Sequence, residues 1–121
     1  MATEQSPRIE KDGTIKWYEG DVFYLHFLFE EKQSGEIIEL YEGDAFEIEF
    51  FNKSGKLVAK KTITSATEGK YVCHIDEKTT RAFPVGEYSY TIQYCRNEND
   101  TIQTVENCGH CVVEGRCGCR A

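Results

Sequence analysis

The sequence predicts an all-β protein, built as one antiparallel β-sandwich of about seven strands. Apolar and polar residues alternate with a period of two in several short segments, which is the pattern of strands that bury one face. Turn signals that contain glycine separate these segments at roughly regular spacing, as they do in sandwiches. The length of 121 residues suits a single domain.

The chain is organised around residues 83–94. Pro84 and Gly86 mark a turn. After the turn, apolar residues take every second position, at Tyr88, Tyr90, Ile92 and Tyr94. This alternation predicts a half-buried strand at the centre of the fold.

Two strands are expected before it in the first part of the chain. Residues 14–18 predict a short first strand, in which Trp17 covers one end of the core. Residues 22–29 form the most apolar segment, with phenylalanine and leucine on one face. The other face is also partly apolar, so we expect another layer or a partner subunit to cover it.

A hairpin follows in the middle of the chain. Residues 45–51 alternate cleanly and predict a strand. Its inward residues are Phe46, Ile48 and Phe50. Residues 52–55, Asn-Lys-Ser-Gly, predict the turn. Residues 56–64 are rich in lysine and β-branched residues, which favours a strand at a solvent-facing edge.

The remaining elements complete the sandwich. Residues 71–75 predict a strand, and Asp76 is a candidate cap for one helical turn through residue 82. After the central strand, residues 101–105 return the chain, and a separate final strand around residues 111–114 closes the sheet.

Three regions result from these elements. Residues 1–13 are polar and without periodicity, and they predict a flexible or partner-ordered arm. Residues 14–114 form the sandwich, and residues 115–121 form a tail that contains cysteine.

Charge and composition exclude several classes of function. The net charge is −7, the sequence pI is near 5.0, and no lysine- and arginine-rich stripe is present. Nucleic acid is therefore not an expected partner. The first ten residues have no apolar core of the kind that a signal peptide needs, and no hydrophobic run is long enough to span a bilayer. We expect no membrane partner, synthesis in a cytoplasm, and thiols that are reduced or bound to metal.

The opening of the central strand resembles the start of strand F in immunoglobulin-like sandwiches. In those folds a tyrosine hydroxyl bonds back to the backbone at the corner between strands E and F. Tyr88, two residues after Gly86, is the expected corner tyrosine. The alternative is that Tyr88 is an inward aromatic residue on some other antiparallel strand.

Three segments together resemble the small immunoglobulin-like modules of tailed-phage virion proteins, such as the N-terminal domain of upper baseplate proteins. They are residues 20–23, 50–58 and 83–90. The resemblance implies a structural component of a virion, made in the bacterial host cytoplasm and without catalytic residues. Modules of this kind also serve in tails and as head decoration or connector pieces. The implied partners are other virion proteins or further copies of this chain in a symmetric assembly.

The C-terminal cysteines are the main candidates for chemistry. Four thiols could bind a structural zinc ion, although the spacing is tighter than usual. The candidate ligands are Cys108, Cys111, Cys117 and Cys119, with His110 as a substitute. Disulfides within this segment, or between it and Cys73 or Cys95, are a second interpretation. Free thiols, with Cys73 as a small core residue, are the third. No other cofactor is expected.

The sequence supports an enzymatic function less well than a structural one. The tetrapeptide Cys108-Gly109-His110-Cys111 has the composition of a thioredoxin-type site, but it leads into a predicted strand rather than a helix. Cys73 and His74 are adjacent on a strand, so their side chains point to opposite faces. Glu47 and Glu49 share a face that solvation explains better than catalysis. We therefore expect no enzyme.

The prediction from sequence is a non-enzymatic structural or binding module that docks through strand edges and its terminal arms. The alternative is a domain that binds a carbohydrate or protein surface through stacking aromatics. The candidate platforms are Trp17, Tyr18, Tyr24 and Tyr41. Core packing is the competing explanation for these residues, and the one that we favour.

Overall fold

A computed structural model describes residues 7–27, 40, 42–65, 71–96 and 101–115, with only the backbone described for residues 101 and 103–108. The described elements are β1 (Arg8–Ile9), β2 (Ile15–Tyr18), β3 (Phe23–Phe27), β4 (Ala45–Asn52), β5 (Leu57–Ile63), β6 (Tyr71–Ile75), α1 (Glu77–Thr80), β7 (Gly86–Arg96) and β8 (Thr101–Glu114). Within this part of the chain, no helix is long and apolar enough to cross a membrane.

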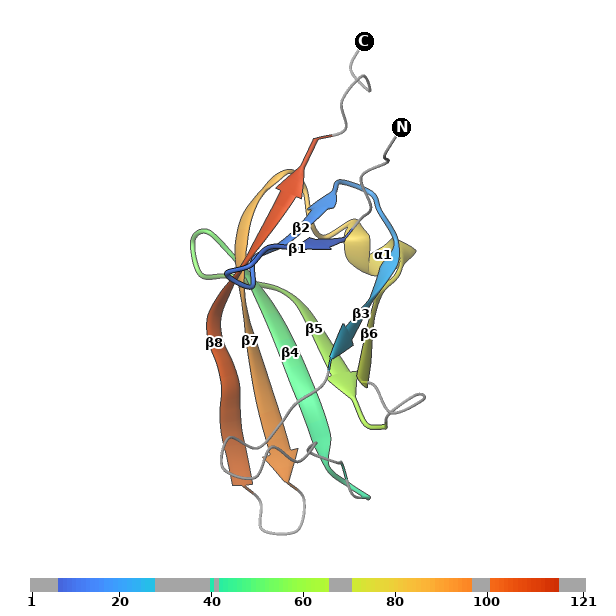
Figure 1. The fold of residues 1–121 in the computed structure, drawn as a ribbon, viewed down its shortest axis with the longest axis vertical. Helices are drawn as coiled ribbons and strands as arrows, with labels where there is room; N and C mark the ends of the chain where they lie inside the picture. Colours follow the sequence, from blue (N-terminus) through green and yellow to red (C-terminus); the bar gives the residue numbers. More distant parts are fainter. Residues whose placement is uncertain (1–6, 28–39, 41, 66–70, 97–100, 116–121) are drawn as a thin grey trace.

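The strands form two open sheets, so the protein is sandwich-like and mostly β. The larger sheet has the order β1-β2-β8-β7-β4-β5, and the smaller one pairs β3 with β6 (Figure 1). The pairing of β2 with β8 is parallel, and every other pairing described is antiparallel. β7 lies between β8 and β4, which confirms the prediction that the turn at Pro84 and Gly86 leads into a central strand.

The core between the sheets is largely aromatic. Trp17, which is fully buried, lies 5.2 Å from Phe23 and 5.3 Å from Phe83 between ring centroids. Phe50 also packs edge-on against Phe83, at 5.3 Å. Trp17 and Phe50 belong to the large sheet and Phe23 to the small one, so these rings join the two layers. The prediction that Trp17 covers part of the core is confirmed.

The alternation read from the sequence sets the faces of β4 and β7. The predicted inward residues are all buried: Phe46, Ile48, Phe50, Tyr88, Tyr90, Ile92 and Tyr94. Phe46 and Tyr94 lie opposite each other in the ladder between the two strands, with ring centroids 5.2 Å apart. Cross-strand pairs of large side chains stabilise a sheet on the face where they meet.

The hairpin between β4 and β5 is confirmed. The side-chain oxygen of Asn52 accepts hydrogen bonds from the backbone N–H groups of Ser54 and Lys56, both at 3.0 Å. Gly55 has a φ of +87°, a backbone conformation that is unfavourable for residues with a side chain. β5 lies at the edge of the large sheet, as its lysine-rich composition predicted.

The helical turn also begins where it was expected. Asp76 is the N-cap of α1, and its carboxylate accepts a hydrogen bond of 2.7 Å from the backbone N–H of Thr79. A cap of this kind satisfies a backbone donor that the helix itself leaves without a partner. This hydrogen bond holds the pKa of Asp76 below its ordinary value.

The chain after α1 makes the corner that the sequence predicted. The Tyr88 hydroxyl donates a hydrogen bond of 2.6 Å to the carbonyl oxygen of Pro84, four residues upstream. Phe83 packs on the Tyr88 ring with centroids 5.0 Å apart. The corner hydrogen bond of Tyr88 is confirmed.

The C-terminal half of the fold differs from the prediction. Instead of two segments, residues 101–105 and 111–114, one strand runs from Thr101 to Glu114. β7 is 11 residues long and pairs with both halves. Two shifts of register, on either side of Ile92, absorb the extra residues of β8.

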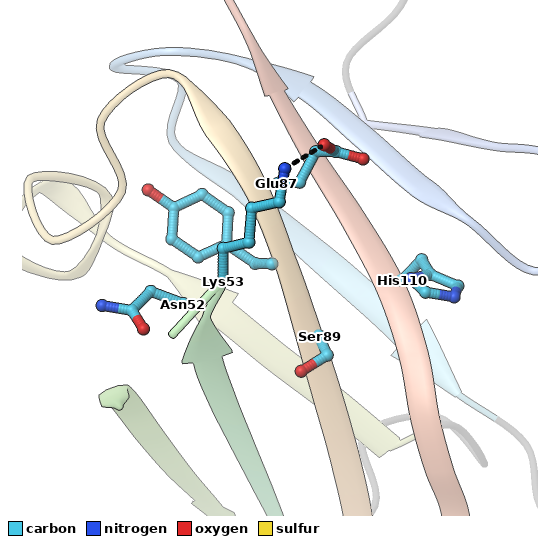
Figure 2. Close-up of a pocket in the computed structure, with 6 residues that line it drawn as sticks. Asn52, Lys53, Glu87, Ser89 and His110 are labelled. Carbon is cyan, nitrogen blue, oxygen red and sulfur yellow. Dashed lines mark hydrogen bonds and ion pairs between the residues drawn. The ribbon is translucent and has the colours of Figure 1, made fainter. Parts of the chain in front are cut away.

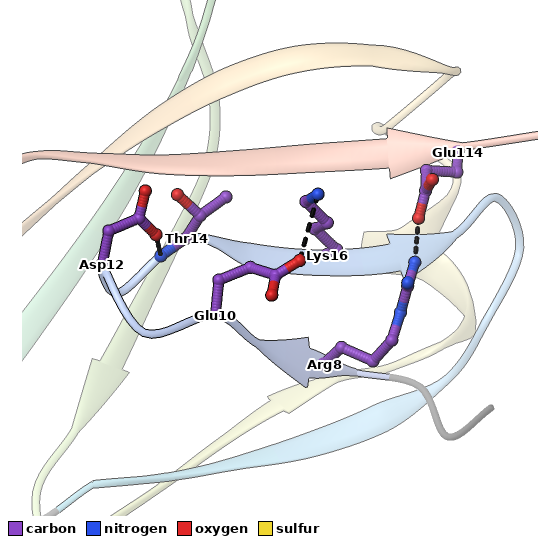
Figure 3. A network of polar contacts seen from close by, with 6 residues as sticks. All are labelled: Arg8, Glu10, Asp12, Thr14, Lys16 and Glu114. Carbon is purple, nitrogen blue, oxygen red and sulfur yellow. Dashed lines mark hydrogen bonds and ion pairs between the residues drawn. The ribbon is translucent and has the colours of Figure 1, made fainter.

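Part of the expected arm is a strand. Arg8 and Ile9 pair with β2, and the connecting turn includes Gly13 at a φ of +92°. Arg8 forms an ion pair with Glu114 of β8, and Lys16 one of 3.1 Å with Glu10 (Figure 3). A strand of two residues is too short to show periodicity, so only contacts with β2 and β8 define it. Residues 1–6 and 116–121 lie outside the described residues.

Candidate binding surface

The outer face of the large sheet, which points away from β3 and β6, is polar and partly exposed. Each core residue of β4 alternates with an outward one, among them Glu47, Glu49 and Phe51. Ser89 of β7 lies opposite Phe51 in the register, and His110 of β8 lies opposite Ser89. Three strands that are far apart in the sequence therefore contribute to one row of this face.

A shallow pocket of about 230 Å³ lies beside this row (Figure 2). We call it the hairpin pocket. It is lined by Asn52, Lys53, Glu87, Tyr88, Ser89 and His110. The first two residues belong to the β4–β5 hairpin, the next three to β7, and the last to β8.

The charges of the hairpin pocket lie at its rim. Lys53 reaches from the hairpin to Glu87, with 3.5 Å between its Nζ and a carboxylate oxygen. Both side chains are largely exposed, at 85% and 69%. An ion pair this exposed contributes little to stability. Both groups are therefore free to exchange this contact for polar groups of a bound molecule.

Beneath the rim the pocket is rigid. Asn52 is held by its turn hydrogen bonds, and Tyr88 by its bond to Pro84. Burial, and to a lesser extent the charge of Glu19, raises the pKa of the Tyr88 phenol. The Tyr88 hydroxyl is engaged by Pro84, and the groups left to a bound molecule are therefore the polar side chains of the other lining residues.

The sequence did not predict that Ser89 and His110 lie opposite each other on neighbouring strands. The two residues are far apart along the chain, and their alternation alone gives only a shared face. In Figure 2 their side chains point away from each other, and no hydrogen bond joins them. The arrangement does not have the hydrogen bond from nucleophile to base that covalent catalysis uses.

The predicted cysteine site falls only partly within the described residues. Cys111 is fully buried in β8, while Cys108 lies in the same strand with its side chain undescribed. Cys117 and Cys119 lie outside the described residues. Within the described part of the chain, no group of three His, Cys, Asp or Glu side chains converges as a metal site.

The environment of Cys111 disfavours redox chemistry at this residue. Burial raises the pKa of its thiol to about 12, whereas thiol attack requires the thiolate. The tetrapeptide from Cys108 to Cys111 lies within a strand, not at a helix N-terminus that would lower a thiol pKa. The four-cysteine zinc site stays a prediction.

Three cysteines can be assigned as free thiols: Cys73, Cys95 and Cys111. Cys73 is buried in β6, as the core interpretation expected, and burial raises its pKa to about 11. Cys95 lies on the outer face and donates a hydrogen bond of 3.2 Å to Glu47. Desolvation, followed by that hydrogen bond, raises its pKa to about 11.

Most of the candidate stacking aromatics are engaged within the protein. Trp17 is fully buried, so it is not a platform. Tyr18 is half-buried, with the Arg8 guanidinium 5.4 Å from its ring centroid. Tyr41 lies outside the described residues. Tyr24 is 56% exposed and stacks on His74 with centroids 4.2 Å apart.

The outward face of the small sheet is exposed in the described structure. Tyr24 and His26 point outward from β3, and the preceding Val22 is 52% exposed. The described elements provide no layer over this face. The predicted cover by another layer or by a partner subunit stays a prediction. His74 and Cys73 occupy opposite faces of β6, so they form no catalytic pair.

The outward carboxylates of β4 form ordinary surface contacts. Glu47 and Lys60 make an ion pair of 2.8 Å across the β4–β5 ladder. Hydrogen bonds from Lys60 and then Cys95 hold the pKa of Glu47 below its ordinary value. A lowered pKa keeps Glu47 ionised, which suits a solvated face and not a general acid.

No protein family, curated protein or solved structure matches this chain.

Proposed function

We propose that this chain is an immunoglobulin-like β-sandwich that works by binding, as a non-enzymatic structural module. One observation carries the proposal. The inner face of the large sheet is closed by the protein's own aromatic residues, whereas no described element covers its outer face. The module therefore needs no partner to complete its core, and it keeps a rigid sheet surface for docking.

The immunoglobulin-like assignment is supported by topology and by one hydrogen bond. β4 pairs with β7 and β7 with β8, while β3 pairs with β6 in the opposite layer. This is the division of strands C, F and G from strands B and E in that fold. The turn α1 joins the layers, and the hydroxyl of Tyr88 closes the corner that follows.

A place in a tailed-phage particle is the more specific part of the proposal, and it is supported by the resemblance of residues 20–23, 50–58 and 83–90 to virion modules. Its partners are then other virion proteins or further copies of the chain in a baseplate, tail, decoration or connector. Repetition in a symmetric particle lets each copy bind weakly and still remain attached.

The test is fractionation of cells that express the chain from its own genome after phage induction. We expect the chain to cosediment with intact particles through a density gradient and to stay attached after washing in moderate salt. A chain found only in the fraction of free protein, with particles that lack it, would overturn the virion role.

A second candidate is recognition of a carbohydrate or protein surface, and the hairpin pocket favours it. Such a binder works as an isolated monomer, so glycan-array screening followed by calorimetry tests it. Saturable binding should weaken in Lys53→Met, which removes the cation at the rim. It should persist in Lys56→Met, because Lys56 lies three residues further along the hairpin and does not line the pocket. Saturable sugar binding by the free chain would replace the structural proposal.

A further inference from the structure

Among the described elements, the N-terminal part of β8 has a neighbouring strand on one side only. β2 pairs with β8 only from Cys111 to Glu114. N-terminal to Cys111, no described strand lies on the side of β8 that faces away from β7. In Figure 1 this part of β8 forms the left border of the sheet. The backbone groups on that side are available to a further strand.

The usable edge is the stretch Thr101–Thr104, which we call the β8 edge. Its residues pair regularly with β7, from Thr101 opposite Arg96 to Thr104 opposite Gln93. Beyond Thr104 the register with β7 shifts twice, and such bulges bend a strand away from flat pairing. A docked strand can therefore follow the β8 edge for about four residues.

The β5 edge and the β8 edge differ in protection. β5 carries Lys60 and Lys61, and lysine on an edge strand opposes pairing with another chain. Lys61 also contacts Asp76, at 3.8 Å, beside the small sheet. The β8 edge reads Thr-Ile-Gln-Thr, with no charge and no proline. Of these two edges, the β8 edge is by its composition the one that accepts a strand.

An exposed apolar side chain marks the same edge. Ile102 is 64% exposed and lies opposite Cys95, which in turn lies opposite Ala45. In an antiparallel sheet, residues opposite each other share a face. The three residues therefore form a row of small or apolar residues across the outer face that ends at Ile102.

We propose that the β8 edge binds the β8 edge of a second copy of this chain, antiparallel and about a two-fold axis through Ile102. This inference rests on the proposed docking function and names the edge and the partner. Ile102 then faces Ile102 of the second copy and Thr101 faces Gln103, so that the paired stretch is Thr101–Gln103. The apolar row continues through the axis into the second copy, and no like charges meet in the paired stretch.

Pairing of two copies through their β5 edges would be unfavourable. An antiparallel pair of β5 strands centred on the lysines brings Lys60 and Lys61 of both copies together, and like charges opposite each other destabilise a sheet. The β8 pairing is short, so the dimer is weak and suits an assembly with many copies. Because each copy carries a net charge of −7, added salt should strengthen the association by screening.

The experiment is sedimentation velocity of the full chain, under reducing conditions that prevent intermolecular disulfides, from micromolar to millimolar concentration. We expect a monomer–dimer equilibrium that shifts toward dimer as salt is added. Ile102→Lys should weaken it by about tenfold or more, because the contact between two isoleucines is replaced by two like charges. Ile9→Lys is the matched control, since Ile9 is also 64% exposed and lies in a strand.

Hydrogen exchange of the wild-type chain identifies the edge without any variant. Amides of the β8 edge should gain protection as concentration rises, while those of β5 should not change. A chain that stays monomeric at millimolar concentration overturns the inference, as does a dimer that protects another surface or responds equally to both lysine variants. A monomer that still cosediments with particles leaves the proposed function intact, whereas a dimer absent from particles removes only the virion role.

Discussion

The two faces of the large sheet use the same strands for different purposes. Phe50 and Phe51 are neighbours on β4, yet Phe50 is 1% exposed among the core rings and Phe51 is half-buried on the outer face. The inner face carries stacked and edge-on aromatic contacts from both layers. The outer face carries exposed ion pairs and the hairpin pocket. Stability is therefore concentrated on the inner face, and the outer face is expected to contribute less to it.

The sharpest test of this contrast is alanine at each of the two phenylalanines. Phe50→Ala should lower the free energy of unfolding by about 3–5 kcal/mol, because it leaves a cavity between Phe83 and Tyr90. Phe51→Ala should cost less, about 1–2 kcal/mol, since Phe51 is only half-buried and leaves no enclosed cavity. Urea unfolding measures both, and equal losses would contradict the contrast.

The next largest loss of stability is expected at a glycine that packs against the inner face. Gly109 lies opposite Tyr90, and a Cβ at this position would lie 2.3 Å from the ring carbon Cζ. Gly109→Ala should therefore cost about 1–3 kcal/mol, as the ring is forced to move. In a thermodynamic cycle with Tyr90→Leu, the alanine should cost much less. Additive losses would show that the ring does not impose the glycine.

A smaller loss of stability is expected from the corner hydrogen bond between Tyr88 and Pro84. Tyr88→Phe should lower the free energy of unfolding by about 0.5–1.5 kcal/mol, because it removes the donor to the Pro84 carbonyl and keeps the ring. Tyr90→Phe is the control, since its hydroxyl makes a longer contact of 3.4 Å with Gly13. Thermal unfolding of the two variants compares them, and a greater loss from Tyr90→Phe would count against the corner.

The outer face should show the smallest effect, and one that depends on pH. Lys60 lowers the pKa of Glu47 in the folded state, so the stabilisation is present above the ordinary carboxyl pKa and is lost as pH falls through the lowered value. Glu47→Gln should destabilise the protein slightly at pH 7 and not at strongly acidic pH. Chemical unfolding over that range tests this, with Glu49→Gln as control. A difference that persists in acid would exclude the ion pair as its cause.

Much of the inner face was predictable because its signals are local. Alternation on β4 and β7 assigns each residue to a face regardless of which strands are neighbours. The turn at Asn52, the cap at Asp76 and the corner at Tyr88 each depend on residues within five positions. Local hydrogen bonds of this kind are encoded by short stretches, and all three were found where expected.

The candidate site was harder to predict because its residues come from separate strands. The hairpin pocket brings Lys53 to Glu87 and His110, and only the register of β4, β7 and β8 makes them neighbours. The spacing of the cysteines predicted a site at the C-terminal end instead. A spacing does not report burial, and Cys111 proved to be a core residue of β8.

The sequence by itself determined which residues face the core and where the main turns fall, since both follow from side-chain periodicity and local hydrogen bonding. Only the tertiary structure decided that residues 101–114 form one strand, that β2 joins it in parallel, and that this pairing stops at Cys111. Pairing between distant strands depends on the packing of the whole sheet. Among the described elements, the same pairing leaves the β8 edge without a strand on its outer side.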